Sequence, residues 1–536
     1  CVGGSRSGAQ ARRTTVCSGD LLGLARPTPR AAGVLPPMTA TGASTEDARG
    51  AVGRRILANT AAPFAANLLG RALSWVLAVV TARTLGPTGT GEYAVAVNLW
   101  VYAGILADFG LGTWLTREVA RRRGDSDAAL ATVVGETVGV RLGLSVVATT
   151  TMVTLAAAGH AAGWLGFDLA WTVVLLAIGL MPGAVAASAS SVYMAHERMG
   201  TPAVLSVAGA VATTLFGAAA LLAGTGIVGL GATSLVVTVA TAVAFVALAR
   251  RSGLPVAVGW PTQNLAALLR DSVPLMLNNL LNSVFFRIDV QVLNVWGRAT
   301  VGQYASAYKV IDGVGGISSS FILALFPMLA RRAGDGGTTG DALSRVYALA
   351  LTLLVIVAMP VAGLLTWIAA PLSGLLWGHD FLPESAIALQ ILIWFLPLSF
   401  VNGLTQYVLI ALGLQARITV AFAAAAIFNL AANLVLVPTY GYVAAALTTI
   451  ATEFVLLVPF ALTISARMPL RPLAGACARP LPAAAFAAGV LVAGSTINAG
   501  VGLAGAGMAY PLGLWATGAI AQDDLVLLIR VIRRRP

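Results

Sequence analysis

Ionisable side chains inside long apolar runs are the residues of this sequence whose type and spacing point to chemistry. Arg71 lies in the run 60–82, and Asn67, Arg71 and Ser74 follow the i, i+4, i+7 spacing of one helix face. A charge at the centre of a membrane helix costs about 2.5–3.5 kcal/mol, so such a residue faces a cavity or a partner. The pattern predicts a polar stripe on the wall of an internal cavity, where its side chains could bind a polar ligand.

A comparable stripe is predicted on the apolar run 271–293. Asn278, Asn282 and Asp289 recur there at helical spacing, and Asn282 takes the place that Arg71 has in the first run. Near the end of the same run, Arg287 and Asp289 predict an ion pair at the membrane interface.

Two further basic residues lie inside apolar runs. Lys309 precedes Asp312 by three residues, a spacing that favours a local salt bridge, although Lys309 can also contact a phosphate or a sugar. Arg141 has a stem long enough to carry its charge into a cavity or to snorkel to the bilayer surface. Both residues are therefore candidates for binding as well as for helix packing.

Five carboxylates inside the runs are candidates for ion pairs or for carrying a proton. Asp108 or Glu136 can pair with Arg71, in which case Arg71 only holds helices together. Glu136 and Glu453 can carry a proton, since burial favours a neutral carboxyl, or each can be neutralised by an arginine. The five are Asp108, Glu136, Asp289, Asp312 and Glu453.

No arrangement of residues predicts catalysis, a metal site or a cofactor. The cysteines form no CxxC pair, and the sequence contains neither an HExxH nor a GxSxG pattern. A membrane glycosyltransferase or polymerase would need a large soluble domain or an extended loop, and the longest predicted outer loop, 370–384, is too short. The cysteines and histidines are Cys1, Cys17, Cys477, His160, His196 and His379.

The composition indicates an integral membrane protein. Of the 536 residues, 58% are hydrophobic and 10% are charged, whereas soluble domains carry about 25% charged residues. The net charge is +12, but the basic residues lie between apolar runs and not on one soluble face. The charge therefore predicts membrane orientation and membrane lipids as partners, with no nucleic acid.

Apolar runs as long as a membrane span recur along the chain. A transmembrane helix needs about 20 mostly apolar residues, whereas a barrel strand needs about 10 with alternating polarity. The runs are continuous, so the sequence predicts an all-α integral membrane protein with about fourteen transmembrane helices. They lie near 60–82, 93–115, 131–157, 169–194, 202–223, 227–249, 271–293, 302–329, 346–369, 385–411, 418–437, 442–464, 480–498 and 501–520.

Basic residues between the runs fall mainly on one predicted side. Of the 33 Lys and Arg residues, 22 lie on that side, and only Arg83 and Arg298 lie in loops on the other. The positive-inside rule then predicts an even number of spans with both termini in the cytoplasm.

An internal repeat relates the two halves of the chain. A shift of 211 residues, with no gap, matches seven residues of identical type, and six predicted spans separate the copies. The copies thus have the same orientation, which is a parallel repeat about an axis along the membrane normal. The alternative is that small residues recur at any membrane helix contact. The matched pairs are Pro63 with Pro274, Asn67 with Asn278, Gly86 with Gly297, Gly91 with Gly302, Tyr93 with Tyr304, Ala94 with Ala305 and Ala96 with Ala307.

The repeat predicts two lobes of six helices followed by two C-terminal helices. Residues 1–55 read as a disordered N-terminal tail, of which 1–37 need not be native, because Met38 is a candidate start. The remaining predicted parts are an N-lobe at 56–250, a cytoplasmic linker at 251–267, a C-lobe at 268–465, and at 466–536 the last two spans with a basic cytoplasmic helix at 522–535.

Four segments resemble the polysaccharide flippases of the multidrug/oligosaccharidyl-lipid/polysaccharide exporter superfamily. The resemblance extends from about residue 55 to the C-terminus, and the combination with fourteen spans in two lobes is more specific than any single segment. The segments are Leu85-Gly86-Pro87-Thr88-Gly89-Thr90-Gly91-Glu92-Tyr93, Asp108-Phe109-Gly110-Leu111, Arg117-Glu118-Val119-Ala120 and Val437-Pro438-Thr439-Tyr440-Gly441-Tyr442.

The resemblance implies a multi-pass protein of the bacterial plasma membrane whose lobes rock to move a polyprenyl-pyrophosphate-linked oligosaccharide to the outer leaflet. Arg71, supported by Arg141 and Lys309, would bind the pyrophosphate, because a guanidinium offers a planar donor fork to phosphate oxygens. Tyr304 and Asn278 would contact sugars, and the last two spans would hold the lipid tail. Glycosyltransferases and a polysaccharide polymerase would be partners.

Three alternatives are compatible with the same sequence. The first is a cation-coupled multidrug exporter of the same superfamily, which would typically have twelve spans and a pocket dominated by carboxylates. The second is a flippase for lipid II of the peptidoglycan pathway. The third is a membrane scaffold of an export complex that transports nothing itself.

Overall fold

The computed structural model describes residues 43–519, with gaps at 123, 125, 256, 261–264 and 335–339. The chain divides into two units, Cys1–Arg55 and Ile56–Pro536. Helix α1 begins in the first unit, and the other helices considered below lie in the second. The predicted segment 1–37, Met38 and the predicted C-terminal helix at 522–535 lie outside the described residues.

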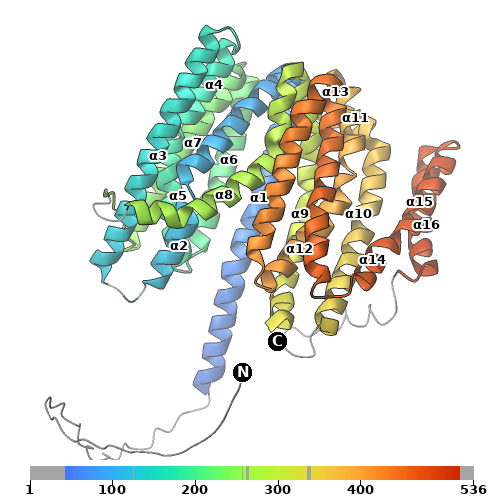
Figure 1. The fold of residues 1–536 in the computed structure, drawn as a ribbon. Helices are drawn as coiled ribbons and strands as arrows, with labels where there is room; N and C mark the ends of the chain where they lie inside the picture. The colour runs from blue at the N-terminus through green and yellow to red at the C-terminus, as the bar shows by residue number, and fades with distance from the viewer. Residues whose placement is uncertain are drawn as a thin grey trace, which may run out of the picture. The chain divides into compact units, whose positions relative to one another are not determined.

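Every regular element of the described residues is a helix, which confirms the all-α prediction (Figure 1). Two short 3-10 helices, Leu293–Trp296 and His379–Phe381, follow α8 and α10. The α-helices are α1 (Ala43–Asp108), α2 (Leu111–Arg121), α3 (Asp127–Ala161), α4 (Phe167–Ile178), α5 (Leu180–Ala195), α6 (Gly200–Leu222), α7 (Gly226–Arg251), α8 (Leu265–Val292), α9 (Arg298–Gly334), α10 (Gly340–Leu376), α11 (Glu384–Leu392), α12 (Phe395–Ala411), α13 (Gln415–Ser465), α14 (Leu470–Ala478), α15 (Pro480–Ser495) and α16 (Ala499–Ala516).

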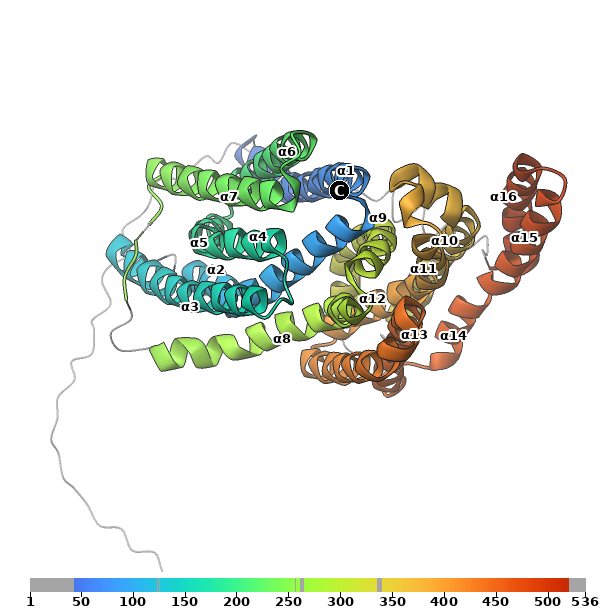
Figure 2. The same cartoon turned by 90° about the horizontal axis from the view of Figure 1, so that it is seen from above.

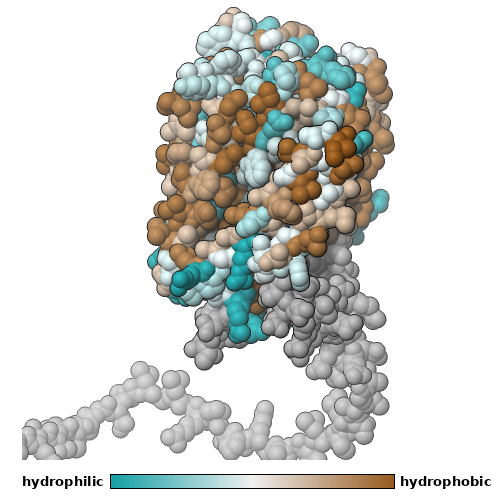
Figure 3. All heavy atoms as spheres, turned by 90° about the vertical axis from the view of Figure 1, so that its right-hand side faces the viewer, coloured by the Kyte–Doolittle hydropathy of each residue, from teal (hydrophilic) through white to brown (hydrophobic). Residues whose placement is uncertain are grey.

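Many of these helices are suited to a bilayer. Within the described ranges, nine helical segments are long and apolar enough to cross a membrane, or ten if the bent pair α11 and α12 counts as one. The face shown in Figure 3 is mainly hydrophobic across its middle, with hydrophilic residues towards its ends. Helix α8 is not among the nine because its polar stripe and charges lower its hydropathy. The number fourteen stays a prediction.

Two long helices each contain two predicted spans separated by a glycine. Gly86 in α1 has φ 64°, and Gly441 in α13 has φ 62°, so the backbone leaves the helical conformation at both points. Only glycine adopts positive φ without strain, which explains a glycine at each reversal. The chain therefore turns back at Gly86 and Gly441 with almost no connecting loop.

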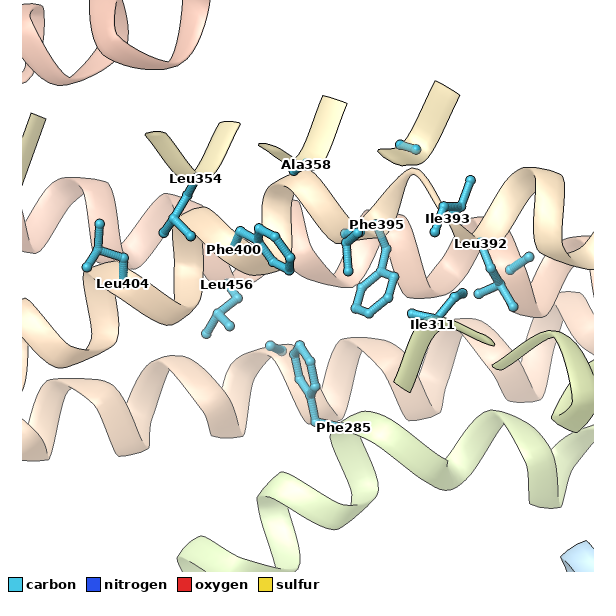
Figure 4. Packing of buried hydrophobic residues seen from close by; sticks show 14 of the residues in the cluster. Phe285, Ile311, Leu354, Ala358, Leu392, Ile393, Phe395, Phe400, Leu404 and Leu456 are labelled. Carbon is cyan, nitrogen blue, oxygen red and sulfur yellow. The ribbon is translucent and has the colours of Figure 1, made fainter. Parts of the chain in front are cut away.

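The helices form two bundles, which Figure 2 shows side by side. We call α1–α7 the first bundle and α8–α13 the second bundle, with α14–α16 packed beside α10. The largest buried cluster fills the second bundle, where Phe285, Phe400 and Leu456 meet from α8, α12 and α13 (Figure 4). Smaller clusters fill the first bundle, one of them around Leu169 and Leu176 of α4.

Helix α8 belongs to the second bundle but also contacts the first. Its C-terminal half packs along α13, whereas its N-terminal half crosses the beginning of α2 at Gly110 (Figure 2). A Cβ atom on Gly110 would lie 2.9 Å from the Ser272 carbonyl oxygen and 2.9 Å from the Met276 nitrogen. The glycine of the Asp108-Phe109-Gly110-Leu111 segment thus permits a close backbone crossing between α2 and α8.

The connection between α7 and α8 lies against a row of glycines on α3. The nitrogen of Gly259 donates to the Gly135 carbonyl oxygen at 3.0 Å. A Cβ atom on Gly139 would lie 1.7 Å from the Gly259 carbonyl oxygen, and the ring of Trp260 covers Gly143. Because glycines at positions 135, 139 and 143 carry no side chains, the backbone of segment 257–260 can lie directly against α3.

Candidate functional site

The polar stripe predicted on α1 is present as one connected group. Arg71 Nε donates to Asn67 Oδ1 at 2.9 Å, and Ser74 Oγ donates to the Arg71 carbonyl oxygen at 3.0 Å. All three residues are exposed, although they lie within an apolar helix. The first bundle therefore presents a guanidinium with free surface at the middle of a membrane span.

Helix α9 of the second bundle meets this stripe. Lys309 Nζ donates to Ser74 Oγ at 3.1 Å, and Arg71 Nη1 donates to the Asp312 carbonyl oxygen at 3.2 Å. A Cβ atom on Gly316 would lie 3.7 Å from Arg71 Nη1, so Arg71 extends along the backbone of α9. Two of the predicted binding cations, Arg71 and Lys309, are thus brought together from different bundles.

Arg287 of α8 adds a third positive charge. Its Nη1 donates to Asn98 Oδ1 at 3.1 Å, and Asn98 is buried. Arg71 and Arg287 are both near enough to act electrostatically on Lys309 and on Asp312. We call Arg71, Arg287, Lys309 and Asp312 the central basic cluster. It contains three cations and one carboxylate, and Lys309 alone is half-buried while the others are exposed.

Two ion pairs predicted for residues of α8 and α9 are not formed. Among the described residues no salt bridge joins Arg287 to Asp289, because residues two apart on a helix point to different sides. Lys309 and Asp312 also form no salt bridge in this part of the chain, since Lys309 extends to Ser74 instead. Both predictions were wrong, and the charges of Arg287 and Lys309 are directed towards the first bundle.

Asp289 lies inside the second bundle. Its Oδ2 accepts hydrogen bonds from Tyr304 Oη at 2.5 Å and from Thr449 Oγ1 at 3.4 Å, and its Oδ1 accepts one from the Val290 nitrogen at 2.8 Å. Tyr304 is completely buried, so in this structure it contacts Asp289 and has no surface for a sugar. Asn278 and Asn282 are exposed on α8, as a binding role for them requires.

Arg141 is not a cavity residue. Its Nη2 pairs with Asp108 Oδ1, its Nη1 donates to Ser188 Oγ at 3.1 Å, and its side chain is 8% exposed. The pair joins α1, α3 and α5 within the first bundle. In this structure Asp108 therefore partners Arg141 and not Arg71, and the Arg141 side chain extends neither to the central basic cluster nor to the surface.

Glu136 lies at the end of the first bundle where the loops carry most basic residues. It is half-buried and lines a cavity of about 280 Å³ together with Arg117 and Arg121 of α2 and with Arg122, which directly follows α2. The buried carboxylate of Glu118 forms salt bridges with two of these arginines. Its oxygens lie 2.6 Å from Arg121 Nη2 and 2.5 Å from Arg122 Nε. The glutamate of the Arg117-Glu118-Val119-Ala120 segment thus organises the arginines around Glu136.

Glu453 is buried among amides that the sequence analysis did not identify. Asn402 Nδ2 donates to Glu453 Oε2 at 2.7 Å, and Asn429 Nδ2 donates to Thr452 Oγ1 at 2.9 Å. Asn433 Nδ2 donates to Asn429 Oδ1 at 3.0 Å. The signal was available, since Asn429 and Asn433 are four residues apart on one face of an apolar run.

Metal-ligating side chains do not cluster in the part of the chain that the structure describes. Within the described ranges no group of three or more His, Cys, Asp or Glu side chains is arranged to hold a metal ion. The site instead holds fixed positive charge between the two helical bundles. Such a site can bind an anionic group without making or breaking a bond.

Family models identify relatives of the chain. A model described as polysaccharide biosynthesis protein matches residues 56–332, which is more than half of the chain, and the MatE model matches residues 274–435. No curated protein matches the chain.

Solved structures share the fold at low sequence identity. The lipid II flippase MurJ in an inward closed conformation is 13% identical with a TM-score of 0.69, and the match covers 86% of this chain and 99% of MurJ. A multidrug resistance MATE family transporter of the MOP superfamily in an inward-facing conformation is 17% identical with a TM-score of 0.60, covering 74% of this chain and 94% of the transporter. The chain therefore belongs to the polysaccharide biosynthesis protein family, within the superfamily of multidrug, oligosaccharidyl-lipid and polysaccharide (MOP) exporters.

Proposed function

We propose that the protein is a flippase that moves a polyprenyl-pyrophosphate-linked oligosaccharide from the cytoplasmic to the outer leaflet, for surface polysaccharide biosynthesis. The observation that carries the proposal is the central basic cluster, in which three cations from α1, α8 and α9 face one carboxylate. The formal excess of two positive charges matches the charge of a pyrophosphate diester.

The geometry of the cluster suits a substrate that passes between the bundles. Arg71 belongs to the first bundle, whereas Lys309 and Arg287 belong to the second, so a bound diphosphate would contact both. The guanidinium groups offer planar donor forks to phosphate oxygens, and the lysine adds a compact charge. Rocking of the bundles would then expose the same cations first to one side of the membrane and then to the other.

The cluster argues against the multidrug exporter as the better proposal. Drugs carried by cation-coupled exporters are commonly lipophilic cations, and three fixed positive charges would repel them. The MatE match and the fold are shared by both classes, so resistance to cationic dyes without an effect on surface glycan would support the exporter.

The carboxylates Asp289 and Glu453 are our proposed sites of coupling to an ion gradient. Each is buried and held by uncharged donors, so each can exist with or without a proton or a bound ion. Asp289→Asn and Glu453→Gln keep an acceptor oxygen while removing the charge. We expect both variants to fold and to flip substrate at a rate that no longer depends on the gradient.

The test of the function is flipping in reconstituted vesicles. A fluorescent polyprenyl-pyrophosphate-linked oligosaccharide is supplied to one leaflet, and its arrival in the other is followed by quenching. Arg71→Ala and Lys309→Ala should each lower the rate by about tenfold or more, since a charge-assisted hydrogen bond contributes about 1.5–3 kcal/mol. The matched control is Arg417→Ala, which removes an exposed arginine outside the cluster.

The outcomes separate the alternatives. Flipping of lipid II in preference to other lipid-linked glycans would identify a peptidoglycan flippase, and failure of the purified protein to move any lipid-linked sugar would support the scaffold. Unchanged flipping in both Arg71→Ala and Lys309→Ala would refute a role for the cluster.

We also propose the bacterial plasma membrane as the location, with both termini cytoplasmic and glycosyltransferases and a polysaccharide polymerase as partners. The support is the distribution of basic residues between the apolar runs, of which 22 fall on one predicted side and two on the other. Tags placed at the two termini should be protected from protease in intact cells, and co-purification should recover the biosynthetic enzymes.

A further inference from the structure

Arg83 and Arg298 are the two arginines that the sequence assigns to loops on the side with few basic residues. In the structure Arg83 lies in α1, close to Gly86, and Arg298 is the first residue of α9. The positive-inside rule disfavours basic residues on that side, so their presence calls for a specific role. Each of the two residues contacts the bundle to which it does not belong. Neither contact was expected from the sequence.

Arg83 of the first bundle binds the C-terminal end of α10 in the second. Its Nε donates to the Leu376 carbonyl oxygen at 3.1 Å, and its Nη2 donates to the Leu375 carbonyl oxygen. The last carbonyls of a helix have no partner within the helix and carry partial negative charge. A guanidinium therefore satisfies two orphan acceptors and joins the bundles at this point.

Arg298 makes the converse contact from the second bundle to the first. Its Nη2 donates to the Trp164 carbonyl oxygen in the connection between α3 and α4 at 3.5 Å. Glu92 of α1 attracts the same guanidinium, and Asn294 Oδ1 accepts from its Nη1 and fixes its direction. Each bundle thus contributes one arginine that reaches the other.

Between these two contacts the bundles touch backbone to backbone. A Cβ atom on Gly91 would lie 1.8 Å from the Arg298 carbonyl oxygen, and one on Gly302 would lie 2.0 Å from the Pro87 carbonyl oxygen. Helices α1 and α9 therefore leave no room for a side chain at their crossing. The bundles are closed against each other at the end of the helices that carries Arg83.

Arg71, Arg287 and Asp312 are exposed between the bundles, and we call the space around these side chains the central cavity. We infer that Arg83 and Arg298 are latches that hold the bundles together at this end and that must release for the central cavity to open there. The inference rests on the proposed alternating access between the bundles. The bonds of both arginines to backbone oxygens are exposed, so water can replace each one as the bundles part. The contacts are suited to closing the cavity reversibly, in contrast to the buried Arg141–Asp108 pair inside one bundle.

The experiment measures access to the cavity and needs no substrate. In a background with Cys1, Cys17 and Cys477 replaced by serine, Ser74→Cys supplies a single thiol beside Lys309. A membrane-impermeant maleimide is added to the outside of intact cells and of right-side-out vesicles, and the labelling rate is measured. Arg83→Ala and Arg298→Ala are each compared with Arg417→Ala, all carrying the same reporter.

We expect each latch variant to raise the labelling rate about tenfold, and the double variant to raise it further, whereas Arg417→Ala should match the parent. Arg83→Lys should give a smaller increase, since one ammonium cannot bridge two carbonyls in the fixed fork of a guanidinium. Thermal unfolding and size-exclusion profiles equal to those of the parent confirm folding of each variant compared.

Equal labelling of the parent and both alanine variants, including no labelling in any of them, would overturn the latch. Failure of the proposed function would be seen separately, as unchanged flipping in the Arg71 and Lys309 variants. A flippase whose cavity access ignores Arg83 and Arg298 would thus refute this inference alone.

Discussion

The hydroxyl of Tyr304 lies 2.5 Å from Oδ2 of Asp289, and both side chains are buried in the second bundle. A buried carboxylate is stable only when donors satisfy it, so this bond anchors α9 to α8. The residue that the sequence offered as a sugar contact therefore has a structural partner.

Removal of that hydroxyl should destabilise the protein. Tyr304→Phe leaves one carboxylate oxygen with only the weak bond from Thr449, so the free energy of unfolding should fall by about 1–3 kcal/mol. Thermal unfolding in detergent measures the change. Tyr308→Phe is the matched control, because the buried Tyr308 hydroxyl has no hydrogen-bond partner among the described residues and its loss should be nearly neutral. Equal destabilisation of both variants would contradict the assignment.

Asp312→Asn should strengthen binding of an anionic lipid. The change removes the single carboxylate of the central basic cluster and raises its excess of positive charge from two to three. A charge about 8 Å away in an aqueous cavity contributes about 0.5 kcal/mol, and a closer one about 1 kcal/mol, so affinity for polyprenyl pyrophosphate should rise about two- to fivefold. Binding titrations measure it, with the exposed Asp380→Asn as control. Weaker binding in Asp312→Asn would show that the carboxylate contacts the ligand favourably.

The buried pair of Arg141 and Asp108 should be costly to break. Arg141→Ala leaves Asp108 without its cation, and the loss should be about 3 kcal/mol, at the lower end for buried pairs because the Asp108 side chain is 26% exposed. The double variant with Asp108→Ala should lose less than the sum of the two single variants. Strict additivity in this double-mutant cycle would show that the two charges do not interact.

A side chain on the α3 glycine row should displace the segment 257–260. In Gly139→Ala the new Cβ would lie 1.7 Å from the Gly259 carbonyl oxygen, and a backbone oxygen cannot rotate away. Protease cleavage near 257–260 should therefore become faster than in the parent. Gly363→Ala in α10 is the control, since its Cβ meets nothing within 4 Å and alanine favours a helix by about 0.5–1 kcal/mol. Unchanged cleavage would mean that the segment does not depend on the row.

The helices and the α1 stripe could be predicted because both depend on the sequence of one helix. Hydropathy locates an apolar helix, and the i, i+4, i+7 spacing groups Asn67, Arg71 and Ser74 whatever lies opposite. Which helix or side chain lies opposite each helix face could not be predicted in the same way. Tyr304 turns into its own bundle, and Arg141 finds Asp108, because packing between helices decides both.

The sequence repeat identified Gly91 and Gly302 as equivalent positions but did not indicate their role. The shift of 211 residues paired Gly91 with Gly302 in the sequence, without indicating that the two copies touch each other. A close crossing of α1 and α9 is a tertiary property, and only the packed structure reveals it. The same holds for Arg287, whose spacing suggested a neighbour on its own helix while its actual partner, Asn98, lies on α1.

The crossing of α1 and α9 is also reciprocal. Gly91 approaches the carbonyl of Arg298, and Gly302 approaches the carbonyl of Pro87. The shift of 211 residues turns one contact into the other, since it relates Gly91 to Gly302 and Pro87 to Arg298. Reciprocal contact of equivalent residues is the mark of an isologous interface in a two-fold homodimer. The two halves of the chain therefore meet as the two identical subunits of a homodimer would. This is the arrangement expected if the gene of such a dimer had been duplicated and fused.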